Sequence, residues 1–191
     1  ASQLLAAAQA GDTQKVQLLI AAGANVNSKG KGGMTPLLAA AGKGNASTVR
    51  VLLDSGALVD VRGERSSTPL YTAAREGYGP VVSLLIAAGA DVNARDTDGY
   101  TPLLRAARGN HAATAQLLLD AGADPNARAV TGYTALMSAA SWGCADVVRV
   151  LLNAGADINA RDKNGWTALK WAEASATKQI SDALVSAGAK R

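Results

Sequence analysis

The sequence predicts an elongated, mostly α-helical repeat solenoid, because two periodic markers return along most of the chain. One marker is a Thr that lies two positions before a Leu, and the other is a Gly followed by Ala; each recurs every 33 residues in the 191-residue sequence. The markers are Thr35, Thr68, Thr101, Thr134 and Thr167, and Gly23, Gly56, Gly89, Gly122, Gly155 and Gly188. A solenoid grows by stacking repeats without needing a second core, so we expect a single domain over residues 1–191.

Each repeat is expected to contain two helices joined by a tight turn. Thr101 is suited to cap the first helix with its hydroxyl, and Pro102 fits the first helical position, where the backbone N–H has no partner. The second helix carries an apolar stripe, for example Val82 with Leu84 to Ile86, and Gly89 ends it. Between the helices, one position that favours left-handed backbone holds Gly44, Gly77, Asn110 and Gly143.

The repeated unit D-x-x-G-[YW]-T-[PA]-L-x-x-A-A, followed by VV-x-LL-x-A-G-A-D-V-N-A-R, resembles the ankyrin repeat, and it covers essentially the whole chain. This resemblance implies six stacked helix-turn-helix units with projecting β-hairpin loops. The His that usually follows T-P-L in that family is absent. Its place is taken by Leu38, Tyr71, Leu104, Met137 and Lys170.

The predicted repeats are 1–29, 30–62, 63–95, 96–128, 129–161 and 162–191. The first and last are expected to be caps with polar outer surfaces, since nothing stacks on their outer sides. Two loops depart from the pattern: the tip 63–66 lacks the final Gly found in the other tips, and 129–131 lacks the usual acidic start. We expect these two tips to be less regular.

Composition limits the broad class of protein. Hydrophobic residues make up 48% of the chain, charged residues 18% and aromatic residues only 4%, so a thin interior of Leu, Val and Ala is expected. The longest apolar runs, such as 81–88, are too short to span a bilayer, so no membrane association is expected. We favour a cytoplasmic location, and a secreted or periplasmic one stays open because the sequence begins with Ala1, which is compatible with processing.

An enzyme with a Cys-His site is one alternative function, and it depends on His111 and Cys144. The two occupy the same position in adjacent repeats, so their backbones should lie about 8–10 Å apart, whereas a dyad needs contact at about 2.6–3.2 Å. A structural role is favoured for both. Two N or S ligands do not make a zinc site, and no phosphate-binding loop is present, so we predict no catalytic residue, metal, cofactor or small-molecule substrate.

Nucleic-acid or anionic-surface binding is a second alternative, because the net charge is +4 and basic residues recur with the same period. This ladder consists of Lys29, Arg62, Arg95, Arg128 and Arg161. Carboxylates such as Asp96 and Asp162 follow directly, and interleaved acid is typical of a solvated, partly paired surface. We therefore favour a protein partner over nucleic acid.

A second basic cluster is more local. Arg105 and Arg108 are three residues apart on one expected helix and share a face, and Arg75 is the equivalent of Arg108 one repeat earlier. The cluster predicts a positive patch in the middle of the solenoid. Simple solubility, with Glu76 as a partial counter-charge, remains the other interpretation.

Aromatic residues carry the main functional hypothesis. Directly before the repeated Thr stand Met34, Ser67, Tyr100, Tyr133 and Trp166, and in ankyrin relatives this position lies on the concave face. Three adjacent repeats are therefore expected to stack Tyr, Tyr and Trp in a column. Trp142 is expected to face the same groove, and the Tyr133 ring should be mostly exposed before a partner binds. Covering backbone at the loop base is the alternative role.

Tyr, Trp and Arg are the residue types that anchor protein interfaces, so the sequence predicts a non-catalytic protein–protein interaction module. Its expected partner is another protein with an acidic or mixed aromatic patch, bound by a monomeric chain. The predicted partner-binding residues are Met34, Arg75, Tyr100, Arg105, Arg108, Tyr133, Trp142 and Trp166.

Overall fold

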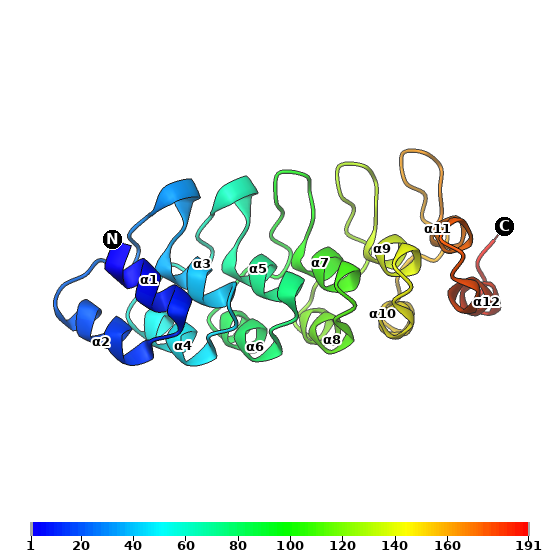
Figure 1. Cartoon of the computed structure of the whole chain (residues 1–191). Helices are drawn as coiled ribbons and strands as arrows, with labels where there is room; N and C mark the ends of the chain where they lie inside the picture. The colour runs from blue at the N-terminus through cyan, green and yellow to red at the C-terminus, as the bar shows by residue number, and fades with distance from the viewer. Residues whose placement is uncertain (1, 191) are drawn as a thin grey trace.

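The computed structural model describes residues 2–190 and arranges them as a row of helix pairs with loops projecting on one side (Figure 1). The first helices of the pairs are α1 (Ser2–Ala10), α3 (Pro36–Ala41), α5 (Pro69–Glu76), α7 (Pro102–Arg108), α9 (Ala135–Ser141) and α11 (Ala168–Ala174). The second helices are α2 (Thr13–Ala21), α4 (Ala46–Asp54), α6 (Gly79–Ala87), α8 (Ala112–Asp120), α10 (Ala145–Asn153) and α12 (Lys178–Ser186). The predicted helical solenoid is confirmed.

The repeated Thr residues begin the first helices, as their spacing predicts. Thr101 has extended backbone angles, and its hydroxyl accepts the N–H of Leu104 at 3.3 Å. Thr35, Thr68, Thr134 and Thr167 make the same contact three residues ahead. Each cap satisfies one of the backbone donors that a helix start leaves open.

The turns between paired helices need left-handed backbone. Gly77 has φ +76°, and a Cβ there would lie 2.4 Å from the His111 imidazole, so both conformation and space select Gly. Asn110, one repeat later, adopts φ 59°, and Ala176 adopts φ 55° in the last pair.

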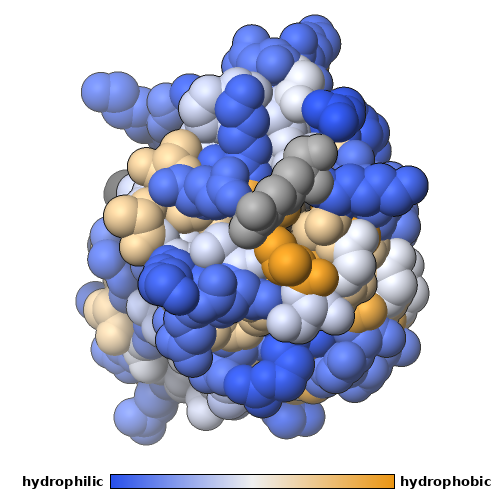
Figure 2. Space-filling view, turned by 90° about the vertical axis from the view of Figure 1, so that its right-hand side faces the viewer, coloured by the Kyte–Doolittle hydropathy of each residue, from blue (hydrophilic) through white to orange (hydrophobic). Residues whose placement is uncertain are grey.

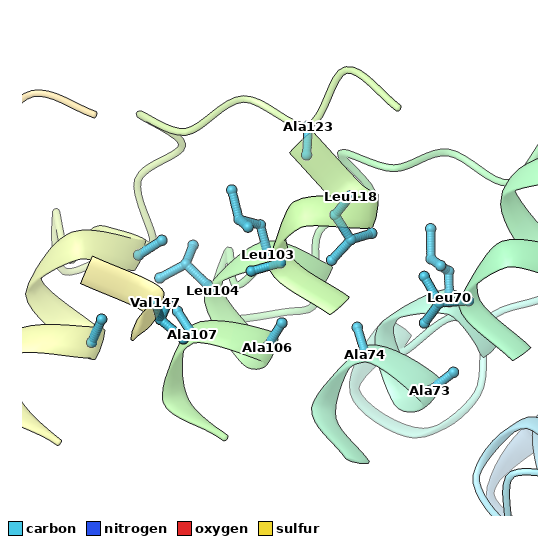
Figure 3. Packing of buried hydrophobic residues seen from close by; sticks show 14 of the residues in the cluster. Leu70, Ala73, Ala74, Leu103, Leu104, Ala106, Ala107, Leu118, Ala123 and Val147 are labelled. Carbon is cyan, nitrogen blue, oxygen red and sulfur yellow. The ribbon is translucent and has the colours of Figure 1, made fainter. Parts of the chain in front are cut away.

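The interior is one continuous apolar layer between neighbouring pairs. In Figure 3, Leu70 and Ala74 of α5 lie in this layer together with Leu103 and Ala107 of α7. These four side chains are at most 1% exposed. Small Ala residues on the first helices let those helices approach closely, and the Leu residues fill the space between layers.

The loops project, but the β-hairpins that the family resemblance implies are not confirmed, because residues 2–190 contain no β-strand. In the loop before α7, the N–H of Asp96 donates to the carbonyl of Tyr100 at 3.0 Å. Asp96 Oδ1 accepts the N–H groups of Asp98 and Tyr100 at 2.9 and 2.8 Å. The carboxylate thus takes donors that a longer strand ladder would need.

Three arginines of the period-33 ladder each join one loop to the next. Arg62 Nη1 donates to the carbonyl of Arg95 at 2.8 Å, and Arg95 Nη1 donates to that of Arg128 at 2.7 Å. Arg128 donates in the same way to Arg161. These guanidinium groups therefore hold neighbouring loops in register.

The tip that lacks the final Gly keeps the form of the tip one repeat earlier but places non-Gly residues in left-handed backbone. The tip 64–66 forms a 3₁₀ turn in which Arg65 and Ser66 have φ 55° and 60°, a region that non-Gly residues enter at a cost. The turn 31–33, which contains Gly32 and Gly33, has a similar form. The loop that starts at Ala129 keeps the usual closing bond, from its N–H to the carbonyl of Tyr133 at 2.9 Å.

The α12 end carries polar side chains over much of its surface (Figure 2). The expected cap residues here are all exposed: Lys170, Glu173, Lys178, Gln179 and Asp182. None of the helices within residues 2–190 has the length and apolar character that crossing a membrane requires.

Candidate partner-binding surface

Two hollows lie where the projecting loops meet the first helices. The first, of about 550 Å³, is bordered by the loop 63–67, α5 and α7, and five predicted residues line it: Met34, Arg75, Tyr100, Arg105 and Arg108. The second, of about 350 Å³, is lined by Tyr100, Arg108, Tyr133 and Trp142 together with Ser138, Trp171 and loop residues. Because Tyr100 and Arg108 belong to both, the hollows adjoin, and we call them together the loop-side groove. Trp166 lines neither hollow.

A buried network fixes the centre of the groove. Asp96 Oδ2 accepts the Tyr71 hydroxyl at 2.6 Å and the Arg105 guanidinium at 3.0 Å, and Arg105 Nε also donates to the Tyr71 hydroxyl oxygen. The side chain of Asp96 is 1% exposed and that of Arg105 only 15%. The three groups come from α5, the loop and α7, so the network ties two repeats together.

Arg105 therefore differs from the exposed positive patch that its spacing predicts. Its charge is paired inside the protein, and its guanidinium carbon lies 4.2 Å from the centre of the Tyr100 ring and 5.1 Å from that of Tyr71. This stacking holds the Tyr100 ring at the boundary between the hollows. The partner-contact role predicted for Arg105 stays a prediction.

The network also shifts two acid–base equilibria. Burial, supported by the hydrogen bond to Asp96, raises the pKa of Tyr71 to about 12. Burial alone would raise the pKa of Asp96, but hydrogen bonds from Tyr71, the Tyr100 N–H and Arg105 outweigh it and lower that pKa. At neutral pH the site holds a neutral phenol against an ionised carboxylate.

The aromatic rings do not form the direct three-ring column that the repeat positions suggest. Trp171 lies between two of them: its ring meets Tyr133 edge-on at 5.4 Å between centroids and Trp166 at 4.8 Å. Its indole N–H donates to Asp162 Oδ2 at 3.1 Å. Tyr100, Tyr133 and Trp166 are half-buried, so the expectation that the Tyr133 ring is mostly exposed is wrong.

Tyr133 has internal partners as well. Its hydroxyl lies 2.7 Å from the Ser141 Oγ and donates to the Met137 carbonyl at 3.3 Å. Burial raises its pKa despite the opposing contact with Ser141. The Tyr133 ring therefore contributes to the fold as well as to the groove surface.

Trp142 is the groove aromatic that is free to meet a partner. Its residue is 60% exposed, and the Arg108 guanidinium lies 5.1 Å from the ring centre. Arg75 pairs with Glu76 at 2.7 Å, and Arg65 pairs with Asp98 across the first hollow. Across residues 2–190, the ion pairs found leave Arg108 without a carboxylate partner.

Sequence reasoning missed Tyr71, Asp96, Asp162 and Trp171 as groove-forming residues. The signal that could have found Asp96, Asp162 and Trp171 is a spacing of nine: Asp96 and Asp162 each precede by nine residues a donor, Arg105 or Trp171, at the same repeat position. Each pair consists of a buried carboxylate at the start of a loop and a hydrogen-bond donor one turn inside the helix that follows.

His111 and Cys144 are directed to different partners. The imidazole Nε2 lies 3.0 Å from the carbonyl of Arg75, where it serves the stacking of repeats. Cys144 is 2% exposed, and burial raises the pKa of its thiol despite a backbone hydrogen bond from Asn110. In the described chain, no group of three or more His, Cys, Asp or Glu side chains is placed to hold a metal ion.

Comparison with known proteins supports the architecture. A family model described as ankyrin repeats (3 copies) matches residues 4–96, 62–129, 80–162 and 131–190. No curated protein matches the chain. Ankyrin repeats generally serve as protein–protein interaction modules and are typically non-catalytic. Since the matches together extend over nearly the whole length, the chain belongs to the ankyrin repeat family.

Proposed function

We propose that this chain is a non-catalytic module that binds another protein along the loop-side groove. The observation that carries the proposal is the pair of adjoining hollows, of about 550 and 350 Å³, walled by Tyr, Trp and Arg side chains. These residue types are enriched in the centres of protein interfaces, where they supply both apolar area and hydrogen bonds.

The internal network supports this function because it orders the groove before a partner arrives. Arg105 is fixed by Asp96 and Tyr71, and it in turn supports the Tyr100 ring. Side chains that are already ordered lose little conformational entropy on binding, which favours affinity.

The expected partner presents an acidic or mixed aromatic surface. Arg75 and Arg108 are exposed at the groove, and the chain carries a net charge of +4. An acidic partner would be attracted by this charge, mainly through a faster association rate.

The two rival functions receive less support. Arg62, Arg95 and Arg128 of the basic ladder already donate to loop carbonyls, which reduces the donors available for phosphates. The His111 imidazole faces a carbonyl oxygen, so it is not poised to activate the Cys144 thiol.

Comparative affinity capture from a lysate of the source cells tests the proposal. The baits are the wild-type chain, the groove variants Met34→Glu and Trp142→Ala, and Arg149→Ala on α10 as a control; all three substituted residues are exposed. We expect one or more proteins captured by the wild type and the control and lost with both groove variants. Proteins captured equally by all four baits would place the binding surface elsewhere.

A further inference from the structure

A buried polar group without a partner belongs to the wall of the second hollow. Ser138 lines this hollow although the residue is 1% exposed, and its Oγ is the one buried side-chain N or O atom among the described residues that has no hydrogen-bond partner. Natural proteins leave few such atoms unpaired, because each costs free energy.

The neighbouring repeats show what is missing. At the position of Ser138, Arg105 and Trp171 stand in the flanking repeats, and each donates to the buried carboxylate of the residue nine positions earlier, Asp96 or Asp162. Nine positions before Ser138 stands Ala129, which offers no acceptor. The repeat 129–161 therefore has the donor position without its carboxylate.

The rim offers an anion a positive counter-charge. Arg108 lines the same hollow and has no carboxylate partner within the described part of the chain. The one carboxylate in the lining, Asp162, has its charge dispersed by three N–H donors: Oδ1 accepts the N–H groups of Asn164 and Trp166 at 2.8 and 2.9 Å, and Oδ2 accepts the Trp171 indole N–H.

A cation is the competing guest, because the aromatic residues Tyr133, Trp142 and Trp171 line the hollow. Arg108 already places its guanidinium 5.1 Å from the centre of the Trp142 ring. A second cation beside Trp142 would be repelled by the Arg108 guanidinium, which already lies over the Trp142 ring. The hollow is thus better matched to a carboxylate on an apolar stem.

We propose that the second hollow is a subsite for a glutamate side chain of the partner protein, with its carboxylate between the Arg108 guanidinium and the Ser138 hydroxyl. The aliphatic stem of the glutamate lies against Tyr133 and Trp171. This inference rests on the proposed function and adds to it the acidic residue that the partner must present.

Blocked pentapeptides test the subsite on the full chain. The probes are acetyl-Gly-Leu-Glu-Leu-Gly-amide and its Glu→Gln and Glu→Lys versions, titrated to millimolar concentration while the three indole N–H signals of the protein are followed by NMR. We expect the Glu peptide to shift the Trp142 and Trp171 signals and to bind about tenfold more tightly than the Gln peptide, the scale of one charge-assisted hydrogen bond. Tighter binding of the Gln or Lys peptide, or no binding of any probe, would overturn the subsite.

Three variants separate specific contacts from general charge. Arg108→Gln should weaken the Glu peptide about tenfold and Ser138→Ala about fivefold. Arg149→Gln, which removes an equal charge on α10, should leave it unchanged. Ser138→Ala removes a hydroxyl that has no partner, so the variant is expected to fold as stably as the wild type. Equal losses in Ser138→Ala and Arg149→Gln would reject the proposal.

The captured partner distinguishes this inference from the function on which it rests. A partner that is lost with Met34→Glu, in the first hollow, but is held normally by Ser138→Ala and Arg108→Gln would leave the groove function standing and reject the glutamate subsite. A partner that is held by every variant would reject the groove function itself.

Discussion

Asp96 and Arg105 form an ion pair of 3.0 Å in which the carboxylate side chain is 1% exposed. Two repeats later, Asp162 and Trp171 make the equivalent contact at 3.1 Å with an indole N–H in place of the guanidinium. In both repeats a buried acid at the loop start is bonded to the helix that follows, so the loop is anchored and the groove wall is fixed.

Arg105→Ala is expected to destabilise the protein by about 3 kcal/mol, because it leaves the buried Asp96 carboxylate without its counter-charge. Urea unfolding monitored by circular dichroism measures the change. Arg75→Ala is the matched control: Arg75 is exposed and pairs with Glu76 at the surface, so a loss below about 1 kcal/mol is expected. Equal losses in the two variants would contradict the buried network.

Alkaline pH should expose the role of Tyr71. Its pKa of about 12 in the folded protein lies above the ordinary 10.0 of an unfolded chain. The contribution of the protonated Tyr71 phenol to the free energy of unfolding is therefore complete below pH 10 and is lost as pH rises through 12. Two pKa units correspond to roughly 2 to 3 kcal/mol. Tyr71→Phe lacks this ionisation and should show a flatter decline in unfolding free energy between pH 10 and 12. Parallel declines in the variant and the wild type would show that Tyr71 ionises normally.

The Cys144 thiol should be inert in the native protein. It is 2% exposed, and burial raises its pKa, so little reactive thiolate is present at neutral pH. Reaction with a chromogenic disulfide reagent is expected to be about 100-fold slower than in urea-unfolded protein, because it requires local opening. A rate equal to that of the unfolded chain would revive a functional cysteine.

Leu103→Ala should cost about 2–5 kcal/mol, since Leu103 is 1% exposed between two layers and its truncation leaves a cavity. Leu4 is also buried, but α1 packs on one neighbouring pair only, so Leu4→Ala should cost less. Chemical denaturation of both variants measures the difference. Similar losses would show that the first pair is as tightly coupled as a central one.

The fold was predictable because its signals are local and periodic. Thr101 as a helix cap and Gly77 as a left-handed turn each follow from the chemistry of one residue at a known place in the repeat. The absence of strands from the loops of residues 2–190 was not predictable in this way. Asp96 Oδ1 captures backbone donors that a strand ladder would use, and this depends on the rotamer of one side chain.

The groove was predictable in its location and only partly in its contacts. The aromatic positions before the repeated Thr place Tyr100 and Tyr133 at the groove, but the same position puts Trp166 outside both hollows. Arg105 looks like an exposed charge because its partners, Tyr71 and Asp96, lie 34 and nine residues away and meet it only in the stacked structure. The repeat period alone does not predict which side chains of neighbouring repeats contact each other.

Calorimetric titration of the captured partner against Trp142→Ala is the most direct test of the groove function. Trp142 is 60% exposed, so the substitution should leave the fold intact while it removes an aromatic anchor that lines the second hollow. We predict a loss of about 2 kcal/mol, roughly 30-fold in affinity, against no change for Arg149→Ala on α10. An unchanged affinity in Trp142→Ala, or an equal loss in the control, would contradict binding through the loop-side groove.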